Sequence, residues 1–233
     1  MSSFEILILA AGKGSRMKSK LPKLLKIVKG KTILDRTIQK AKKLKPKKIN
    51  VLINKDLNEV RTKYKNINFL NQKKQLGTGH ALKVFYNENK EIKNDVVIMM
   101  ADAPFIKLQD IKKVGDELKK NSIVVLGAKL KNNKSNGVFF FKKNKIQKIK
   151  EYKLLKKNER KQLICNTGVF GIKKKYLKLS LNLKKNIKKK EYLITDIVNL
   201  AYKKKIKVKL VIASSGIKSF GINTISELKN VNK

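Results

Sequence analysis

The sequence predicts an α/β fold with a Rossmann-like, doubly wound and mostly parallel sheet that carries a small antiparallel insertion. Segments with strand and helix patterns alternate over the first half of the chain. Two runs, residues 6–11 and 96–100, are apolar throughout, as in strands that are buried on both faces. Alternation of this kind is most simply satisfied by parallel strands joined through helices.

The elements follow in a regular order. Short apolar runs predict strands over residues 4–10, 49–53, 68–70, 96–100 and 122–126. Apolar residues at helical spacing predict helices over 33–44, 56–64, 77–86 and 108–118. Three short strand-like pieces, 137–141, 146–149 and 165–172, predict the antiparallel insertion. A helix over 191–202, a strand over 208–212 and a helix over 224–231 complete the order.

Length and composition predict one domain over residues 1–233. A chain of 233 residues that is 41% hydrophobic is long enough for one large α/β domain and short for two. No apolar run approaches a membrane span, and the start lacks a basic leader with a cleavage site, so we expect a cytoplasmic protein without membrane contact. The lone cysteine, Cys165, excludes an internal disulfide and a cysteine-based metal cluster.

The formal net charge of +43 indicates nucleic acid as one partner class. However, only four of the 59 basic residues are arginines, and the lysines are spread along the whole chain rather than clustered. Nucleic-acid readers favour arginine for bidentate contacts. We therefore expect a solvated lysine surface, no specific nucleic-acid site, and non-specific polyanion binding only at low salt.

The turn after the first strand predicts a phosphate site. The sequence Gly12-Lys13-Gly14-Ser15-Arg16-Met17 follows the apolar run, and Lys23 comes seven residues after Arg16. Glycines let backbone N–H groups approach phosphate oxygens, and the cations neutralise the phosphate charge. The motif is neither the dinucleotide fingerprint nor the P-loop. The alternative is a lysine-rich turn that merely contains glycines.

Four further segments carry candidate ligands. Asp102 directly follows the strand over 96–100 and is placed to hold Mg²⁺, or else caps a turn. Gln72 and Gln75 are spaced to read a base edge, and Gly77 and Thr78 offer N–H groups at a helix start, or else form an ordinary helix entry. Asn166 and Asn223 are candidates for a sugar and a metal contact, respectively, or are turn residues.

Together these segments resemble a known family over nearly the whole chain. The matching motifs are Leu9-Ala10-Ala11-Gly12-Lys13-Gly14-Ser15-Arg16-Met17, Leu21-Pro22-Lys23, Gln75-Leu76-Gly77-Thr78-Gly79-His80, Asp102-Ala103-Pro104, Cys165-Asn166-Thr167-Gly168, Glu191-Tyr192-Leu193-Ile194-Thr195-Asp196 and Gly221-Ile222-Asn223. The chain is similar to the uridylyltransferase domain of bacterial N-acetylglucosamine-1-phosphate uridylyltransferases. These are sugar-nucleotide pyrophosphorylases of the MobA-like NTP transferase superfamily.

The resemblance implies a fold of the nucleotide-diphospho-sugar transferase type and a role for each matching residue. Catalytic cations would be Lys13, Arg16 and Lys23. The nucleotide would be bound by Leu9, Ala10, Ala11, Gly12, Gln72, Gln75, Gly77 and Thr78. The amino sugar would be bound by Gly137, Glu151 and Asn166, and the Mg²⁺ cofactor by Asp102 and Asn223. The implied reaction transfers UMP from UTP to N-acetylglucosamine-1-phosphate, a step toward cell-wall peptidoglycan, with His80 in a structural role.

Three features depart from the family pattern. Met100-Ala101 stands where the family has Tyr-Gly, and Val138 follows Gly137 where the family has arginine; we expect the Ala101 methyl group near the sugar. We expect no acetyltransferase β-helix like that of the bifunctional enzymes, and therefore a monomer, with any acetyltransferase a separate partner. Two alternatives stay open: a related nucleotidyltransferase with another NTP or phosphorylated acceptor, and a non-catalytic nucleotide- or polyanion-binding protein.

Overall fold

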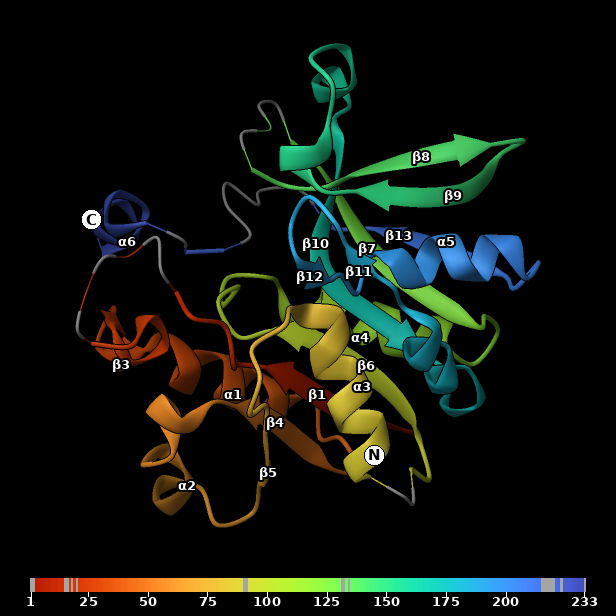
Figure 1. The fold of residues 1–233 in the computed structure, drawn as a ribbon. Helices are drawn as coiled ribbons and strands as arrows, with labels where there is room; N and C mark the ends of the chain where they lie inside the picture. Colours follow the sequence, from red (N-terminus) through yellow and green to blue (C-terminus); the bar gives the residue numbers. More distant parts are fainter. Residues whose placement is uncertain are drawn as a thin grey trace.

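The centre of the computed structural model is a nine-stranded sheet (Figure 1). The structure describes residues 3–14, 17, 19, 21–89, 92–130, 133, 135–214, 221–222 and 224–232. Seven strands lie in the order β13-β7-β10-β6-β1-β4-β5, and β8 and β9 branch from β10. The seven are β1 (Phe4–Leu9), β4 (Ile49–Ile53), β5 (Asn68–Asn71), β6 (Asp95–Met100), β7 (Ile123–Lys129), β10 (Ile164–Ile172) and β13 (Val208–Ile212).

The sheet is mostly parallel, as predicted. The strands β6, β1, β4 and β5 pair in parallel, and so do β7 and β13. Among these seven strands β10 alone runs in the opposite direction, pairing antiparallel with both β6 and β7. Residues 165–172 are antiparallel, as predicted, but they belong to the central sheet and not to an insertion. The insertion proper is the hairpin of β8 (Val138–Lys142) and β9 (Lys145–Lys150).

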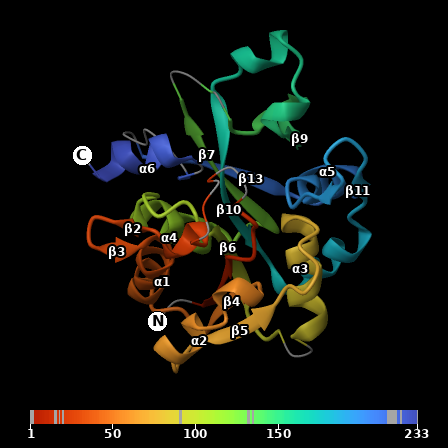
Figure 2. The same cartoon turned by 60° about the vertical axis from the view of Figure 1, so that its left-hand side comes forward.

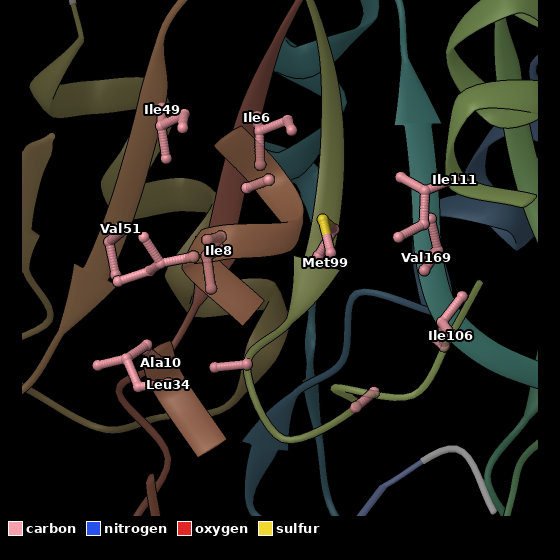
Figure 3. Close-up of a cluster of buried hydrophobic side chains, with 14 of the residues drawn as sticks. Ile6, Ile8, Ala10, Leu34, Ile49, Val51, Met99, Ile106, Ile111 and Val169 are labelled. Atoms are coloured by element: carbon pink, nitrogen blue, oxygen red, sulfur yellow. The ribbon is translucent and has the colours of Figure 1, made fainter. Parts of the chain in front are cut away.

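Helices cover both faces of the sheet (Figure 2). The alternation of side chains along β1 explains why two faces need cover: Ile6 and Ile8 point into one core cluster, and Leu7 and Leu9 into the other. The first cluster packs on α1 and α4 (Figure 3), and the second on α3 and α5. The helices are α1 (Ile33–Lys43), α2 (Val60–Lys63), α3 (Thr78–Glu88), α4 (Leu108–Glu117), α5 (Asp196–Lys203) and α6 (Ile225–Asn232).

Two predicted helices are shorter in the structure. The helix predicted over 56–64 is a 3₁₀ turn, η3 (Lys55–Leu57), followed by α2; only Leu57 and Val60 of these two elements are buried, too few for a longer amphipathic helix. The helix predicted from residue 191 begins at Asp196. Its first residues instead form β12 (Glu191–Tyr192), because the N–H groups of Tyr192 and Ile194 donate to the segment that leads into α3.

Shorter elements connect the layers. They are η2 (Lys23–Leu25), β2 (Ile27–Val28), β3 (Lys31–Thr32), η4 (Tyr152–Leu154), η5 (Asn158–Lys161), η6 (Lys174–Asn182) and β11 (Lys185–Asn186). The sequence patterns did not predict η6 or the small hairpins. None of the helices in the described ranges has the length and apolar character that a bilayer crossing requires.

Candidate functional site

The turn after β1 buries its first side chains and exposes the residues that follow. Leu9, Ala10 and Ala11 are buried, whereas Gly12 and Lys13 are exposed. Asn54, at the end of the neighbouring strand β4, donates from Nδ2 to the Ala11 carbonyl over 3.2 Å and so fixes the turn. The exposed part of this turn is the backbone at Gly12 and the side chain of Lys13.

Lys23 and Asp102 meet at this edge of the sheet. Asp102 follows β6 directly, and β6 lies beside β1 in parallel, with Leu9 opposite Met100. The Lys23 ammonium lies 2.5 Å from Asp102 Oδ2. The Lys23 side chain is only 9% exposed, whereas that of Asp102 is 32% exposed. The structure thus brings together a cation and a carboxylate that are 79 residues apart.

Gly14 permits this approach. Its φ of +62° lies in the left-handed region, and a Cβ atom built on it would be 2.8 Å from the Cβ of Lys23. Any side chain at residue 14 would therefore force Lys23 to move. The second glycine of the turn is needed to seat the lysine as well as to expose backbone.

A pocket of about 340 Å³ opens beside the turn, and Gly12, Lys13 and Lys23 contribute to its lining. Asn54 and Asp56 also line it, and sequence reasoning missed both. Asn54 is 5% exposed, and its Oδ1 accepts from the Asp56 N–H over 2.9 Å. The signal that could have found them is their position after β4, because ligands of open α/β sheets gather at the carboxyl ends of the strands.

The segment Gln72 to His80 is fastened to the segment before α5. Gly77 has a φ of +101°, and a Cβ there would lie 2.5 Å from the Tyr192 carbonyl oxygen. The Tyr192 N–H donates to the Leu76 carbonyl, and the Ile194 N–H donates to Thr78 Oγ1 over 3.1 Å. The two motifs that are most specific to the resembled family therefore form one unit, with Gln75 half-buried beside them.

Gln72 holds this unit from within. Its side chain is buried, and its Nε2 donates to the Gly77 carbonyl over 3.1 Å and lies 2.9 Å from His80 Nδ1. Burial, with the charges of Lys83 and Lys74, lowers the pKa of His80. The neutral imidazole accepts from the amide, which fits the structural role predicted for His80. The amide nitrogen of Gln72 is used in these two hydrogen bonds. The predicted contact of Gln72 with a base would therefore be made by its amide oxygen.

The predicted sugar residues Gly137, Glu151 and Asn166 lie together where β8, β9 and β10 meet. The Asn166 N–H donates to the Gly137 carbonyl over 2.8 Å. A Cβ on Gly137 would be 3.4 Å from the Glu151 Cα. Asn166 Oδ1 accepts from the Gly168 N–H, so part of its amide shapes the local turn. Helix α5 packs on β9 at this corner.

Two further residues belong to this corner. Thr195 is buried, and its hydroxyl donates to Glu151 Oε1 over 3.1 Å, while Lys189 lies 3.8 Å from Glu151 Oε2. Burial, and then the charge of Glu151, raises the pKa of Asp196. The motif around Thr195 was visible in the sequence, but its spacing gave no role to any single side chain.

The methyl group of Ala101 does not face the sugar side, and this expectation is wrong. Ala101 is 1% exposed and belongs to the core cluster under α1. Met100 instead contacts the sugar side, because a Cβ on Gly168 would lie 2.6 Å from the Met100 Cγ. Arg16 and Asn223, predicted as a phosphate ligand and a metal ligand, lie outside the described residues. Ile222 donates from its N–H to the Asp102 carbonyl over 2.9 Å.

The residues around Asp102 suit Mg²⁺ that is bound jointly by protein and substrate. They do not suit a metal ion whose ligands all come from the protein. Within the described residues, no three histidine, cysteine, aspartate or glutamate side chains gather around one point. Mg²⁺ characteristically uses one or two carboxylates together with substrate phosphates and water. Asp102 offers one carboxylate beside the Gly12 turn and Lys23, where bound phosphates would supply the remaining oxygen ligands.

Comparison with known proteins shows the family. The sequence model of the MobA-like NTP transferase domain matches residues 6–166, more than half of the chain. This chain belongs to the MobA-like NTP transferase family. The nucleotidyltransferase is also similar to two proteins named bifunctional protein GlmU. That of Buchnera aphidicola subsp. Baizongia pistaciae is 36% identical over 99% of this chain, and that of Wigglesworthia glossinidia brevipalpis is 33% identical over 98%.

The chain spans about half the length of these relatives, 52% and 51% respectively. A solved structure from Bacillus anthracis, whose name assigns it as a glucose-1-phosphate thymidylyltransferase, superposes with a TM-score of 0.76 at 23% identity. The superposition covers 98% of this nucleotidyltransferase and 94% of that chain. At this identity the likeness shows the fold, which is the one predicted from the sequence.

Proposed function

We propose that this nucleotidyltransferase transfers UMP from UTP to N-acetylglucosamine-1-phosphate, with UDP-N-acetylglucosamine and pyrophosphate as products. The observation that carries the proposal is the meeting of Lys23, Asp102 and the Gly12 turn at one edge of the sheet. The motif resemblance and the GlmU relatives support these two substrates over others.

In the proposed reaction a phosphate oxygen of the sugar-1-phosphate attacks the α-phosphorus of UTP, and the bond to the pyrophosphate leaving group breaks. The attacking phosphate is already ionised near neutral pH, so no general base is needed. Lys13 and Arg16 hold the β- and γ-phosphates, and Lys23 holds the α-phosphate or the sugar phosphate. Catalysis rests on in-line positioning and charge neutralisation. Mg²⁺, held by Asp102 and Asn223, would add positive charge at the phosphates.

The two ends of the substrates would be recognised on opposite sides of the Lys23–Asp102 pair. Uracil is read by Gln72, Gln75, Gly77 and Thr78, and the amino sugar by Gly137, Glu151 and Asn166. The hydrogen bond from Thr195 to Glu151 and the nearby Lys189 hold that carboxylate in place for a sugar hydroxyl.

A second candidate reaction uses another nucleotide and sugar. The Bacillus anthracis structure, named for glucose-1-phosphate and thymidylyl transfer, favours this possibility at the level of the fold. Thymine and uracil differ by one methyl group, which a hydrophobic contact discriminates by only about 1–3 kcal/mol.

The test is pyrophosphate release by the purified protein with Mg²⁺, with four NTPs crossed against a panel of sugar-1-phosphates. We expect release with UTP and N-acetylglucosamine-1-phosphate, and none after a chelator is added. Release with another pair only would reassign the substrates. No release with any pair would leave a nucleotide- or polyanion-binding protein, for which nucleic-acid affinity should be sequence-independent and fall steeply with salt.

A further inference from the structure

Asp102 lies in a connecting segment that belongs to neither a strand nor a helix. Residues 101–107 connect the end of β6 at Met100 to the start of α4 at Leu108. The Lys107 carbonyl accepts from N–H groups of α4, whereas the carbonyls of Ala101, Asp102, Pro104 and Ile106 are bonded by groups from elsewhere in the chain. The position of the Asp102 carboxylate therefore depends on whichever donors hold this connection.

Two side chains of α1 supply three of these hydrogen bonds. Thr37 Oγ1 lies 2.9 Å from the Ala101 carbonyl oxygen. Lys40 Nζ donates to the Pro104 carbonyl over 2.5 Å and also to the Ile106 carbonyl. Thr37 and Lys40 are three residues apart, so they lie on the same face of the helix. On the far side, the Ile222 N–H donates to the Asp102 carbonyl.

We propose that Lys40, with Thr37, is a positioning residue for the reaction: it clamps the connection 101–107 so that Asp102 stands at the phosphate site. This inference rests on the proposed function, in which Asp102 meets the metal and the triphosphate. Lys40 does not belong to the described residues that line the pocket beside the Gly12 turn. Lys40 acts through the Pro104 and Ile106 carbonyls, which follow Asp102. Thr37 acts through the Ala101 carbonyl, which precedes Asp102.

The surroundings of Lys40 distinguish it from most of the other lysines. Most lysines here are solvated, but Lys40 is half-buried, and its described partners are two backbone carbonyls rather than a carboxylate. Burial, with the charge of nearby Arg36, lowers the pKa of Lys40 to about 8. The fold keeps a costly buried ammonium because hydrogen bonds from a charged donor are stronger than neutral ones.

The test compares Lys40→Met with Lys43→Met. Both changes remove one charge from α1 and keep an unbranched side chain, but the Lys43 side chain is exposed and has no hydrogen-bond partner among the described residues. The first readout is amide hydrogen exchange of residues 101–107 in the ligand-free protein, which depends on neither substrate nor metal. We expect exchange about tenfold faster in Lys40→Met and unchanged in Lys43→Met, the size of losing one charged hydrogen bond.

The second readout is turnover. We expect the Mg²⁺ concentration at half-maximal rate to rise about tenfold in Lys40→Met, and kcat at limiting Mg²⁺ to fall while KM for the sugar phosphate stays near that of the parent. Excess Mg²⁺ should restore most of kcat. A change that merely loosened the fold would not be rescued by the metal.

Exchange and Mg²⁺ dependence equal to those of Lys43→Met would overturn the inference. If Lys40→Met does not fold, the inference is tested with Thr37→Val, which replaces a hydroxyl by a methyl group. The same two measurements apply to this variant. If the parent protein releases no pyrophosphate, that result would contradict the proposed function and not this inference. The exchange measurement would then still decide whether Lys40 clamps this connection.

Discussion

The Lys23 ammonium and the Asp102 carboxylate neutralise each other over 2.5 Å at the mouth of the phosphate site. In the proposed reaction both groups have other partners, since the ammonium binds a phosphate and the carboxylate binds Mg²⁺. Binding of the nucleotide and binding of the metal should therefore favour each other, because each frees a group that the other partner needs.

The change Lys23→Met separates the two roles. Without the ammonium, Mn²⁺ no longer competes with Lys23 for the Asp102 carboxylate. Mn²⁺ should then bind the nucleotide-free protein about fivefold more tightly, if the ion pair contributes about 1 kcal/mol. Turnover should nevertheless fall at least about a hundredfold, because the ammonium that neutralises the transferring phosphate is lost. Titration with Mn²⁺ and the pyrophosphate assay measure the two effects. Weaker Mn²⁺ binding would contradict the competition.

Asp102→Ala should reduce turnover at least about a hundredfold, roughly 3 kcal/mol, with the fold intact. The same loss is predicted for Arg16→Ala from the sequence alone. Asp116→Ala is the matched control, since Asp116 is exposed and pairs with Lys112 on the same helix. Near-parental turnover in Asp102→Ala, with circular dichroism unchanged, would exclude this carboxylate from the reaction.

Gly77→Ala should destabilise the protein by about 2 kcal/mol, because φ of +101° is accessible chiefly to glycine and the new Cβ would strike the Tyr192 carbonyl. Gly12→Ala is the control for folding, because a Cβ at Gly12 meets no atom within 4 Å. Urea unfolding measures both. Equal stability in the two variants would mean that the Gln72–His80 unit is not held against β12.

Stability should fall as the pH drops below the usual His80 pKa of 6.5. The folded protein lowers this pKa, so the unfolded chain binds the proton first and acid favours unfolding; above 6.5 both states are neutral and the effect vanishes. His80 is the single histidine, so His80→Asn should remove most of the slope between pH 5.5 and 6.5. Denaturant midpoints across pH 5.5–7.5 provide the measurement. A slope that persists in the variant would assign it to other groups.

Lys205→Gly should stabilise the protein by about 1 kcal/mol. Lys205 has φ of +56° just past the end of α5, where its N–H donates to Tyr202 and the Ile206 N–H donates to Ala201, the pattern of a Schellman motif. Glycine adopts this conformation without the cost that a lysine Cβ incurs. Lys203→Gly, within the helix, removes the same charge and should destabilise by a similar amount. Thermal unfolding of the two variants should shift in opposite directions.

The sequence predicted those parts of the site that follow from the ends of strands. Gly12 and Asp102 were predicted because a buried run that ends in small or charged residues marks the edge where ligands bind, and Lys23 was predicted from its spacing after Arg16. The structure brings Lys23 and Asp102 together at this edge. Asn54 follows the same rule but was missed, since an asparagine before a helix looks like a cap. Thr195 and Lys40 could not be found, because their roles arise from contacts 44 and 64 residues away along the chain.

The fold was predictable where local pattern and tertiary packing agree. The helix expected from residue 191 failed at its start because hydrogen bonds to Leu76 and Thr78 use the N–H groups of Tyr192 and Ile194. Strand β10 failed differently: its residues were recognised as a strand, but no local signal says which neighbours a strand will choose.

The place of β10 also sets an order of assembly. On the ribosome, β6 and β7 emerge before the strand that fills the gap between them, and each keeps an unpaired edge until residue 172 has left the exit tunnel. During synthesis of the roughly forty residues that follow β7, the edges of β6 and β7 that later pair with β10 are unpaired and open to wrong pairing. At ordinary elongation rates this takes a few seconds. A stall in that interval would leave a half-built sheet as a target for chaperones.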